Sequence, residues 1–297
     1  MLTTTSESLK RELLGTDPYI KPSFYQSSDK LGWTYIACDF GQFLYCATYP
    51  HRDKYDLVTH GDKFLQAFDM LSDEDSEKLF YDRILRDQCS IISLKDHKTS
   101  SPYFPEEIKK RMTDSEVFID CGAYTGDTLE EFKKQTNNVF KSAYLFEMDD
   151  EIFQRLTKNP NVNDSRIRCI QAGVSDRDCE ITYRKDGCPS YAIQMESAEN
   201  TGRAKLKCID GLVENGVIQD PITFVKMDIE GAEIDALRGM EKTMQRDRPK
   251  LAICVYHRPD DLWEIPLYIK SIVPQYEFVL RHHAFLNCDT VLYAYIE

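Results

Sequence analysis

The segment EVFIDCGAYTGDT at residues 116–128 indicates how this chain folds. The apolar run 117–119 predicts a buried strand at 117–120, which runs into a turn containing Gly122 and Gly126. A helix is expected directly after the turn. The glycines have no side chain, so the backbone can approach a ligand closely, and the start of the helix offers unpaired N–H groups. The segment therefore predicts a ligand-binding turn between a strand and a helix.

The ligand expected at this turn is positively charged. In dinucleotide sites the helix start faces a pyrophosphate, but here Asp120 ends the strand while Asp127 and Thr128 open the helix. An acidic mouth disfavours pyrophosphate and suits a nucleoside that carries an ammonium and a sulfonium. Asp120 is expected to meet the amino group of a methionine tail, and Tyr124 to place its ring near the cation.

A second acidic residue, Glu147, ends the apolar run Tyr144-Leu-Phe-Glu. An acidic side chain ~20 residues beyond a glycine turn is the expected partner of a ribose diol. The alternative is that Glu147 caps the following helix and that the glycines serve only the turn. The candidate cofactor-binding residues are Asp120, Gly122, Tyr124, Gly126, Asp127, Thr128, Glu147 and Asp228.

From residue 116 onward, short apolar runs alternate with amphipathic segments, as in a parallel sheet with crossover helices. Strands are expected at 117–120, 143–146, 167–172, 222–227 and 251–256, and helices at 128–135, 150–158, 232–244 and 262–273. The runs 277–281 and 290–296 predict a closing antiparallel hairpin. A NAD-type domain would instead continue into a second mononucleotide-binding half.

Residues 1–115 lack the regular alternation of apolar and amphipathic segments seen from residue 116 onward. This difference predicts a separate, partly helical extension before a domain at 116–297. A helix is expected within 69–87, with Ser72 and Asp75 as a capping pair. No fold is assigned to the aromatic-rich residues 19–49.

Composition limits the partners and the compartment. The formal charge of −13 argues against nucleic acid and membrane surfaces. The ten cysteines are scattered without a Cys-x-x-Cys pair, and the N-terminus shows no apolar signal sequence. We therefore expect a cytoplasmic protein without disulfides or structural zinc.

Three segments together resemble the FkbM-type methyltransferases: FIDCGAYTGDT, YLFEMD and FVKMDIEGAE, the last at residues 224–233. A weaker fourth is LKCID at 206–210. The resemblance covers 116–296 and implies a Rossmann-like class I α/β fold with a mostly parallel seven-stranded sheet. It also implies S-adenosylmethionine as methyl donor and O-methylation, commonly of sugars. Tyr124 departs from the smaller polar residue that many relatives carry there.

The chemistry is expected beyond the carboxyl ends of the fourth and fifth strands, where Asp228 and His257 would share one rim. A neutral His257 is the predicted general base, with Asp228 orienting the acceptor or the base. Glu230 and Glu233 are the predicted acceptor-binding residues. The alternatives are that His257 is an idle histidine in a loop and that Glu233 is a helix-start carboxylate. Asp228, Glu230 and His257 also suit a divalent metal, but no ligand spacing enforces one, so no metal is assigned.

Three functions are compatible with these patterns. The favoured one is O-methylation of a sugar or another small-molecule hydroxyl. The alternatives are a nicotinamide-dependent oxidoreductase and a non-catalytic module whose working surface is residues 1–115. His282 and His283 would either line an acceptor pocket or, as we favour, lie at a solvated strand end.

Overall fold

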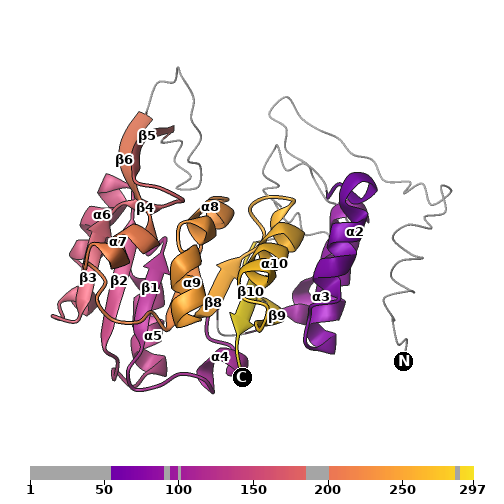
Figure 1. Ribbon diagram of the computed structural model, residues 1–297, viewed down its shortest axis with the longest axis horizontal. Helices are drawn as coiled ribbons and strands as arrows, with labels where there is room; N and C mark the ends of the chain where they lie inside the picture. Colours follow the sequence, from indigo (N-terminus) through magenta and orange to yellow (C-terminus); the bar gives the residue numbers. More distant parts are fainter. Residues whose placement is uncertain (1–54, 90–93, 100–101, 185–200, 285–287) are drawn as a thin grey trace, which may run out of the picture.

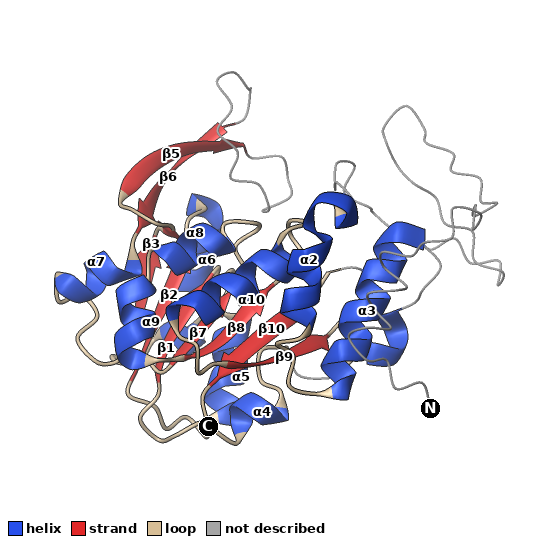
Figure 2. Ribbon diagram, turned by 45° about the vertical axis from the view of Figure 1, so that its right-hand side comes forward, coloured by secondary structure: helices blue, strands red, loops and turns tan. Residues whose placement is uncertain are grey.

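The computed structural model describes residues 55–89, 94–99, 102–184, 201–284 and 288–297. Its centre is a seven-stranded sheet in the order β3-β2-β1-β7-β8-β10-β9, with helices on both faces (Figures 1 and 2). The strands are β1 (Val117–Cys121), β2 (Ser142–Glu147), β3 (Ile167–Gln171), β7 (Phe224–Met227), β8 (Lys250–Cys254), β9 (Glu277–His282) and β10 (Thr290–Tyr295).

The five strands from β3 to β8 run parallel, and β10 is antiparallel to both β8 and β9. The predicted parallel sheet with a closing antiparallel hairpin is therefore confirmed. Within the sheet, the chain first forms β1, adds β2 and β3 on one side, and then returns to form β7 on the other side of β1. Ligands bind where the strand order reverses in this way, so the carboxyl ends of β1 and β7 mark the expected site.

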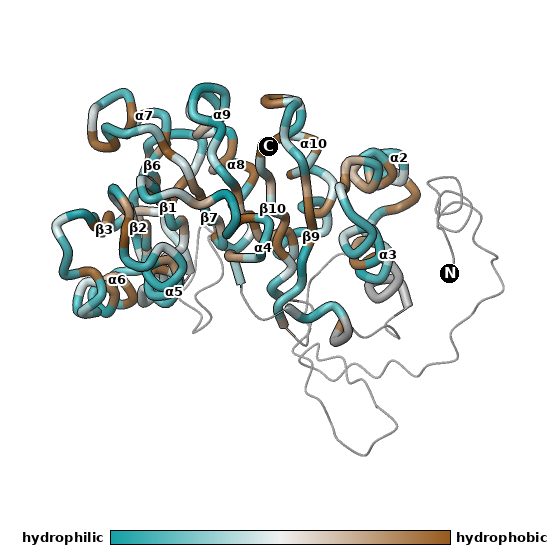
Figure 3. Tube along the Cα trace, turned by 90° about the horizontal axis from the view of Figure 1, so that it is seen from below, coloured by the Kyte–Doolittle hydropathy of each residue, from teal (hydrophilic) through white to brown (hydrophobic). Residues whose placement is uncertain are grey.

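Alternating side chains of the strands feed two hydrophobic cores. In β1, for example, Val117 and Ile119 belong to one core and Phe118 to the other. The first core lies under α2 (Leu57–Phe68), α3 (Glu74–Cys89), α7 (Ile209–Glu214), α8 (Glu233–Arg238), α9 (Glu241–Asp247) and α10 (Asp261–Ile272). The second lies under α4 (Glu106–Lys109), α5 (Asp127–Gln135) and α6 (Asp150–Thr157). Figure 3 shows hydrophobic stretches along the strands between helices of mixed character.

The prediction of a single helix at 232–244 is wrong, because the segment forms the two helices α8 and α9. The carbonyl oxygen of Gly239 accepts a hydrogen bond from the backbone N–H of Asp210 at 2.9 Å. The Asp210 carboxylate then accepts from the N–H groups of Lys242 and Thr243, both at 2.9 Å, and so caps α9. A contact with a distant segment thus replaces the continuing helical turn.

The first two described helices of the N-terminal region, α2 and α3, pack against the sheet domain. Helix α2 contacts α10, and α3 lies along the edge strand β9. The predicted capping pair is wrong: Asp73 accepts the hydrogen bond from the N–H of Ser76 at 2.7 Å, whereas the Ser72 hydroxyl accepts from Phe278 at 3.2 Å. Helices α2 and α3 share the first core, whereas Phe104 and Ile108 belong to the second, and the boundary at 115 stays a prediction.

A second, three-stranded sheet was not anticipated. It has the order β4-β6-β5 and is made of β4 (Gly173–Val174), β5 (Cys179–Arg184) and β6 (Thr201–Lys207). Strands β5 and β6 rise above the carboxyl ends of β1 and β2 in Figure 1. Two 3-10 turns, η1 (Leu94–His97) and η2 (Pro160–Val162), complete the elements of the described chain. Within that part of the chain, no helix has the length and apolar character to span a membrane.

Candidate functional site

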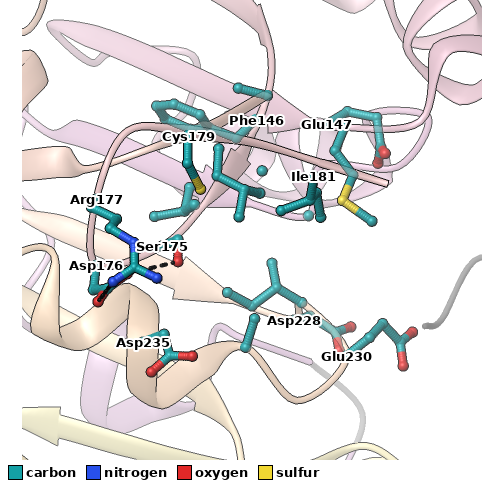
Figure 4. Close-up of a pocket in the computed structure, with 18 of the residues that line it drawn as sticks. Phe146, Glu147, Ser175, Asp176, Arg177, Cys179, Ile181, Asp228, Glu230 and Asp235 are labelled. Carbon is teal, nitrogen blue, oxygen red and sulfur yellow. Dashed lines mark hydrogen bonds and ion pairs between the residues drawn. The ribbon is translucent and has the colours of Figure 1, made fainter. Parts of the chain in front are cut away.

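A cavity of about 560 Å³ lies at the carboxyl ends of β1, β2 and β7. This volume is typical of small-molecule sites, which occupy ~300–1,000 Å³. Its far wall comes from the second sheet, through Cys179, Ile181 and Leu206 (Figure 4). The charged side chains of the lining are Glu147, Asp176, Arg177, Asp228, Glu230 and Asp235. The wall is therefore acidic, but neither Asp120 nor Asp127, to which the sequence analysis assigned an acidic mouth, belongs to the lining.

The glycine turn contributes to this cavity through Gly122 and Tyr124. Gly122 has a φ of +83°, and a Cβ atom at this position would collide with the backbone carbonyl of Asp228. Its small size is thus needed for contact between the ends of β1 and β7. The remaining predicted residues of the turn, Gly126, Asp127 and Thr128, lie at the start of α5 outside the lining.

Glu147 is held rigidly at the cavity wall. Its Oε2 accepts a hydrogen bond from the N–H of Tyr124 at 3.1 Å, and its Oε1 accepts from Asp149 at 2.9 Å. Burial raises the pKa of this carboxyl. The first turn of α6 is capped by Asp149, whose side chain accepts from the N–H groups of Glu151 and Ile152. Helix capping is therefore carried out by the neighbouring residue, and the Glu147 side chain faces the cavity (Figure 4).

Asp120 does not reach the cavity, which differs from its predicted contact with a methionine tail. The side chain is fully buried, and its Oδ1 lies 3.1 Å from the Nζ of Lys226, its register partner on β7. Lys226 Nζ also donates a hydrogen bond to the carbonyl oxygen of Gly122 at 2.7 Å. Burial alone would lower the pKa of Lys226, but the carboxylates of Asp120 and Asp228 raise it, so the ammonium stays charged. The pair supports the turn from behind.

Asp228 lies on the cavity wall and is oriented by two tyrosines. The Tyr103 hydroxyl donates to its Oδ2 at 2.8 Å, and the Tyr256 hydroxyl donates to its Oδ1 at 3.1 Å. Burial would raise the pKa of this carboxyl, but the positive charges of Lys226 and His257 lower it below its usual value. Asp228 is therefore an ionised, positioned carboxylate.

His257 stands behind Asp228, surrounded by carboxylates. Its Nε2 lies 3.3 Å from Asp228 Oδ1 and 3.2 Å from Glu230 Oε2, and its Nδ1 lies 2.9 Å from Glu233 Oε1. Burial would lower the pKa of the ring, but Glu233, Asp228 and Glu230 raise it to about 9. The structure thus brings the predicted residues together. With this pKa the ring is positively charged at neutral pH, in contrast to the neutral base that the sequence predicted.

Glu233 has no exposed surface, which is incompatible in this structure with its predicted role of gripping an acceptor. Its carboxylate accepts from the N–H groups of Ile229 and Gly231, both at 2.9 Å, in addition to its contact with His257. It fixes the loop after β7. Glu230, by contrast, has a side chain 33% exposed and lines the cavity.

Comparison with known proteins agrees with this geometry. Residues 120–286 match the family described as the Methyltransferase FkbM domain. The chain belongs to the FkbM methyltransferase family. Its structure is similar to the crystal structure of Methyltransferase FkbM from Methylobacillus flagellatus, with a TM-score of 0.67 and 28% identity over 81% of this chain and 60% of that one. The predicted family and fold are thereby confirmed.

A curated relative of this FkbM-family chain is the hexuronic acid methyltransferase AglP of Haloferax volcanii. The two are 28% identical over 104 residues, which cover 35% of this chain and 43% of the relative. The chain therefore spans about half the length of the relatives it matches, between 43% and 60%.

Several residues of the FkbM-family site had escaped sequence analysis. Tyr103 gave no signal because it reaches Asp228 from 125 positions away. The wall at 172–177 follows the third parallel strand, and that position could have revealed it. The preference for a solvated end at His282 and His283 was wrong. Both are buried, the first against Thr290 and the second against Thr99 and Tyr293.

Proposed function

We propose that this chain transfers a methyl group from S-adenosylmethionine to a hydroxyl oxygen of a saccharide. The cofactor assignment rests on Glu147, a carboxylate fixed by two backbone N–H groups on the cavity wall. In that position it suits the two hydroxyls of a ribose. Tyr124, next to it, is 43% exposed and offers an aromatic face to a cation.

The charge of the cavity supports a cationic cofactor. Its described lining holds five carboxylates and one guanidinium, that of Arg177. Such a wall repels a pyrophosphate and attracts a sulfonium and an ammonium. Because Asp120 lies behind Gly122, we propose that it acts on the cofactor through Lys226 and the turn.

When bound, the cofactor supplies a methyl group whose bond to sulfur breaks, leaving its electron pair on sulfur, as the bond to the acceptor oxygen forms. The chain's task is to place that oxygen in line and to accept its proton. Asp228 faces the cavity and has an orientation fixed by Tyr103 and Tyr256, so we propose that it contacts the hydroxyl and accepts its proton. His257, with a side chain 5% exposed, acts through Asp228 as a positioning residue.

The saccharide acceptor is proposed from the relative AglP, whose name specifies a hexuronic acid. Glu230 supports it, because a partly exposed carboxylate beside Asp228 can accept hydrogen bonds from sugar hydroxyls.

The cofactor is tested by thermal shift with S-adenosylhomocysteine and with NAD. We expect stabilisation by the first, reduced in Glu147→Gln. Stabilisation by NAD alone would contradict the proposal.

The reaction is tested by labelled methyl transfer to a panel of hexuronic acids and neutral sugars. Asp228→Asn and His257→Ala should keep their affinity for S-adenosylhomocysteine while kcat falls by roughly two orders of magnitude. Glu214→Gln, an exposed change paired with Lys242, is the matched control. Unchanged turnover in Asp228→Asn would remove that residue from the mechanism.

A further inference from the structure

We infer that the residues Asp228, Glu230 and His257 form a binding site for a divalent cation such as Mg²⁺ or Mn²⁺ at the acceptor side of the cavity. The inference extends the proposed function, because the ion would contact the acceptor hydroxyl. The three side chains come from the ends of two neighbouring strands, β7 and β8.

The Nε2 atom of His257 points into this group without a hydrogen bond of its own to any described residue. Among the described residues, its buried Nε2 has no hydrogen-bond partner, although Asp228 Oδ1 and Glu230 Oε2 lie 3.3 and 3.2 Å away. The ring nitrogen is therefore directed between two carboxylates rather than at one acceptor. Neighbouring ligands of an octahedral ion with bonds of ~2.1 Å are separated by ~3.0 Å, close to these spacings.

Neighbouring side chains orient two of the proposed ligands, His257 and Asp228, through hydrogen bonds, as is usual at metal sites. Glu233 binds the Nδ1 side of the ring at 2.9 Å, so Nε2 is the ligand atom, and it would release its proton when the ion binds. Carboxylate–histidine–metal relays have this arrangement, and the two tyrosine hydroxyls on Asp228 orient the second ligand. Glu230 has a φ of +60°, a strained backbone conformation that recurs at functional sites. Possible ligand atoms of Asp228 and His257, together with the supporting carboxylate of Glu233, lie within 4.8 Å of one another.

The charge of the site gives the ion a function. Three carboxylates meet here, in a chain of formal charge −13, so an anionic acceptor such as a hexuronic acid would be repelled. A divalent ion would attract it and, by coordinating the hydroxyl, favour loss of its proton. The carboxylate oxygens of Asp228 and Glu230 suit Mg²⁺ and Mn²⁺, and the imidazole favours Mn²⁺ of these two ions.

The test is Mn²⁺ binding to the full chain, followed by electron paramagnetic resonance without donor or acceptor. We expect one ion per chain and a nitrogen coupling from an imidazole ligand in the pulsed spectrum. Glu230→Gln should weaken binding by about tenfold or more, and His257→Ala should also abolish the nitrogen coupling. Asp235→Asn, which removes a carboxylate from the same cavity outside the cluster, should leave binding unchanged.

Absence of stoichiometric binding, or equal weakening in Asp235→Asn and Glu230→Gln, would overturn the inference. S-adenosylhomocysteine affinity is measured in the same samples, with circular dichroism as a check on folding. Cofactor binding without Mn²⁺ binding would refute the metal site and leave the proposed function standing. Mn²⁺ binding without cofactor binding would refute the proposed function and leave the metal site standing.

Discussion

The buried pair Asp120–Lys226 should be strongly coupled energetically. Each residue lies in one of the two longest motifs of the sequence, and the charged atoms are 3.1 Å apart on adjacent strands. At this distance, an effective dielectric constant of ~20 gives an attraction of about 5 kcal/mol. The cost of removing both charges from water offsets part of it.

We expect Lys226→Met and Asp120→Asn each to lower the free energy of unfolding by about 3–5 kcal/mol, because each leaves a buried group without its partner. The double variant should lose less than the sum, with a coupling of about 3 kcal/mol. Urea unfolding followed by circular dichroism measures all four proteins, provided that the slope against urea stays constant. A coupling below about 0.5 kcal/mol would refute the reasoning.

The same variants separate two roles of Asp120. If it acts through Lys226 and the Gly122 carbonyl, affinity for S-adenosylhomocysteine should fall in Lys226→Met as well as in Asp120→Asn. A fall confined to Asp120→Asn, without loss of stability, would instead indicate direct contact with the cofactor.

Three further changes test the fold around the site. Gly122→Ala should lower the free energy of unfolding by on the order of 3 kcal/mol, because φ is positive and a Cβ meets the Asp228 carbonyl. Gly216→Ala, with φ +70° and open space around it, should lower it by only about 1 kcal/mol, and equal losses in chemical unfolding would contradict the close approach. Asp210→Ala should lower stability by about 1–2 kcal/mol by uncapping α9, and an unchanged Tm would argue against that cap. Burial lowers the pKa of His283 from 6.5 to about 4, so the folded state resists protonation, and the free energy of unfolding should fall by up to about 3 kcal/mol as pH drops from 6.5 to 4. If His283→Gln loses stability with the same dependence on pH, this histidine is not the cause.

Local patterns along the chain were sufficient for the sheet and for part of the site. The alternation of apolar runs and amphipathic segments predicted all seven strands of the main sheet and its antiparallel end. The glycine turn and Glu147 were predicted from their spacing, and both lie on the cavity. These features depend on neighbours a few residues away, which the sequence displays directly.

Long-range contacts decided the rest. The break between α8 and α9 depends on Asp210, and the orientation of Asp228 on Tyr103, neither of which is close in sequence. Charge states also required the fold. The motif predicted Asp120 to be a cofactor-binding carboxylate, but its burial makes it the ion-pair partner of Lys226. The carboxylates around His257 raise the pKa of its ring, so that the ring is positively charged. The sequence by itself determined which residues end the strands. Only the tertiary structure decided what each of them faces, because desolvation and distance to other charges exist only once the strands lie side by side.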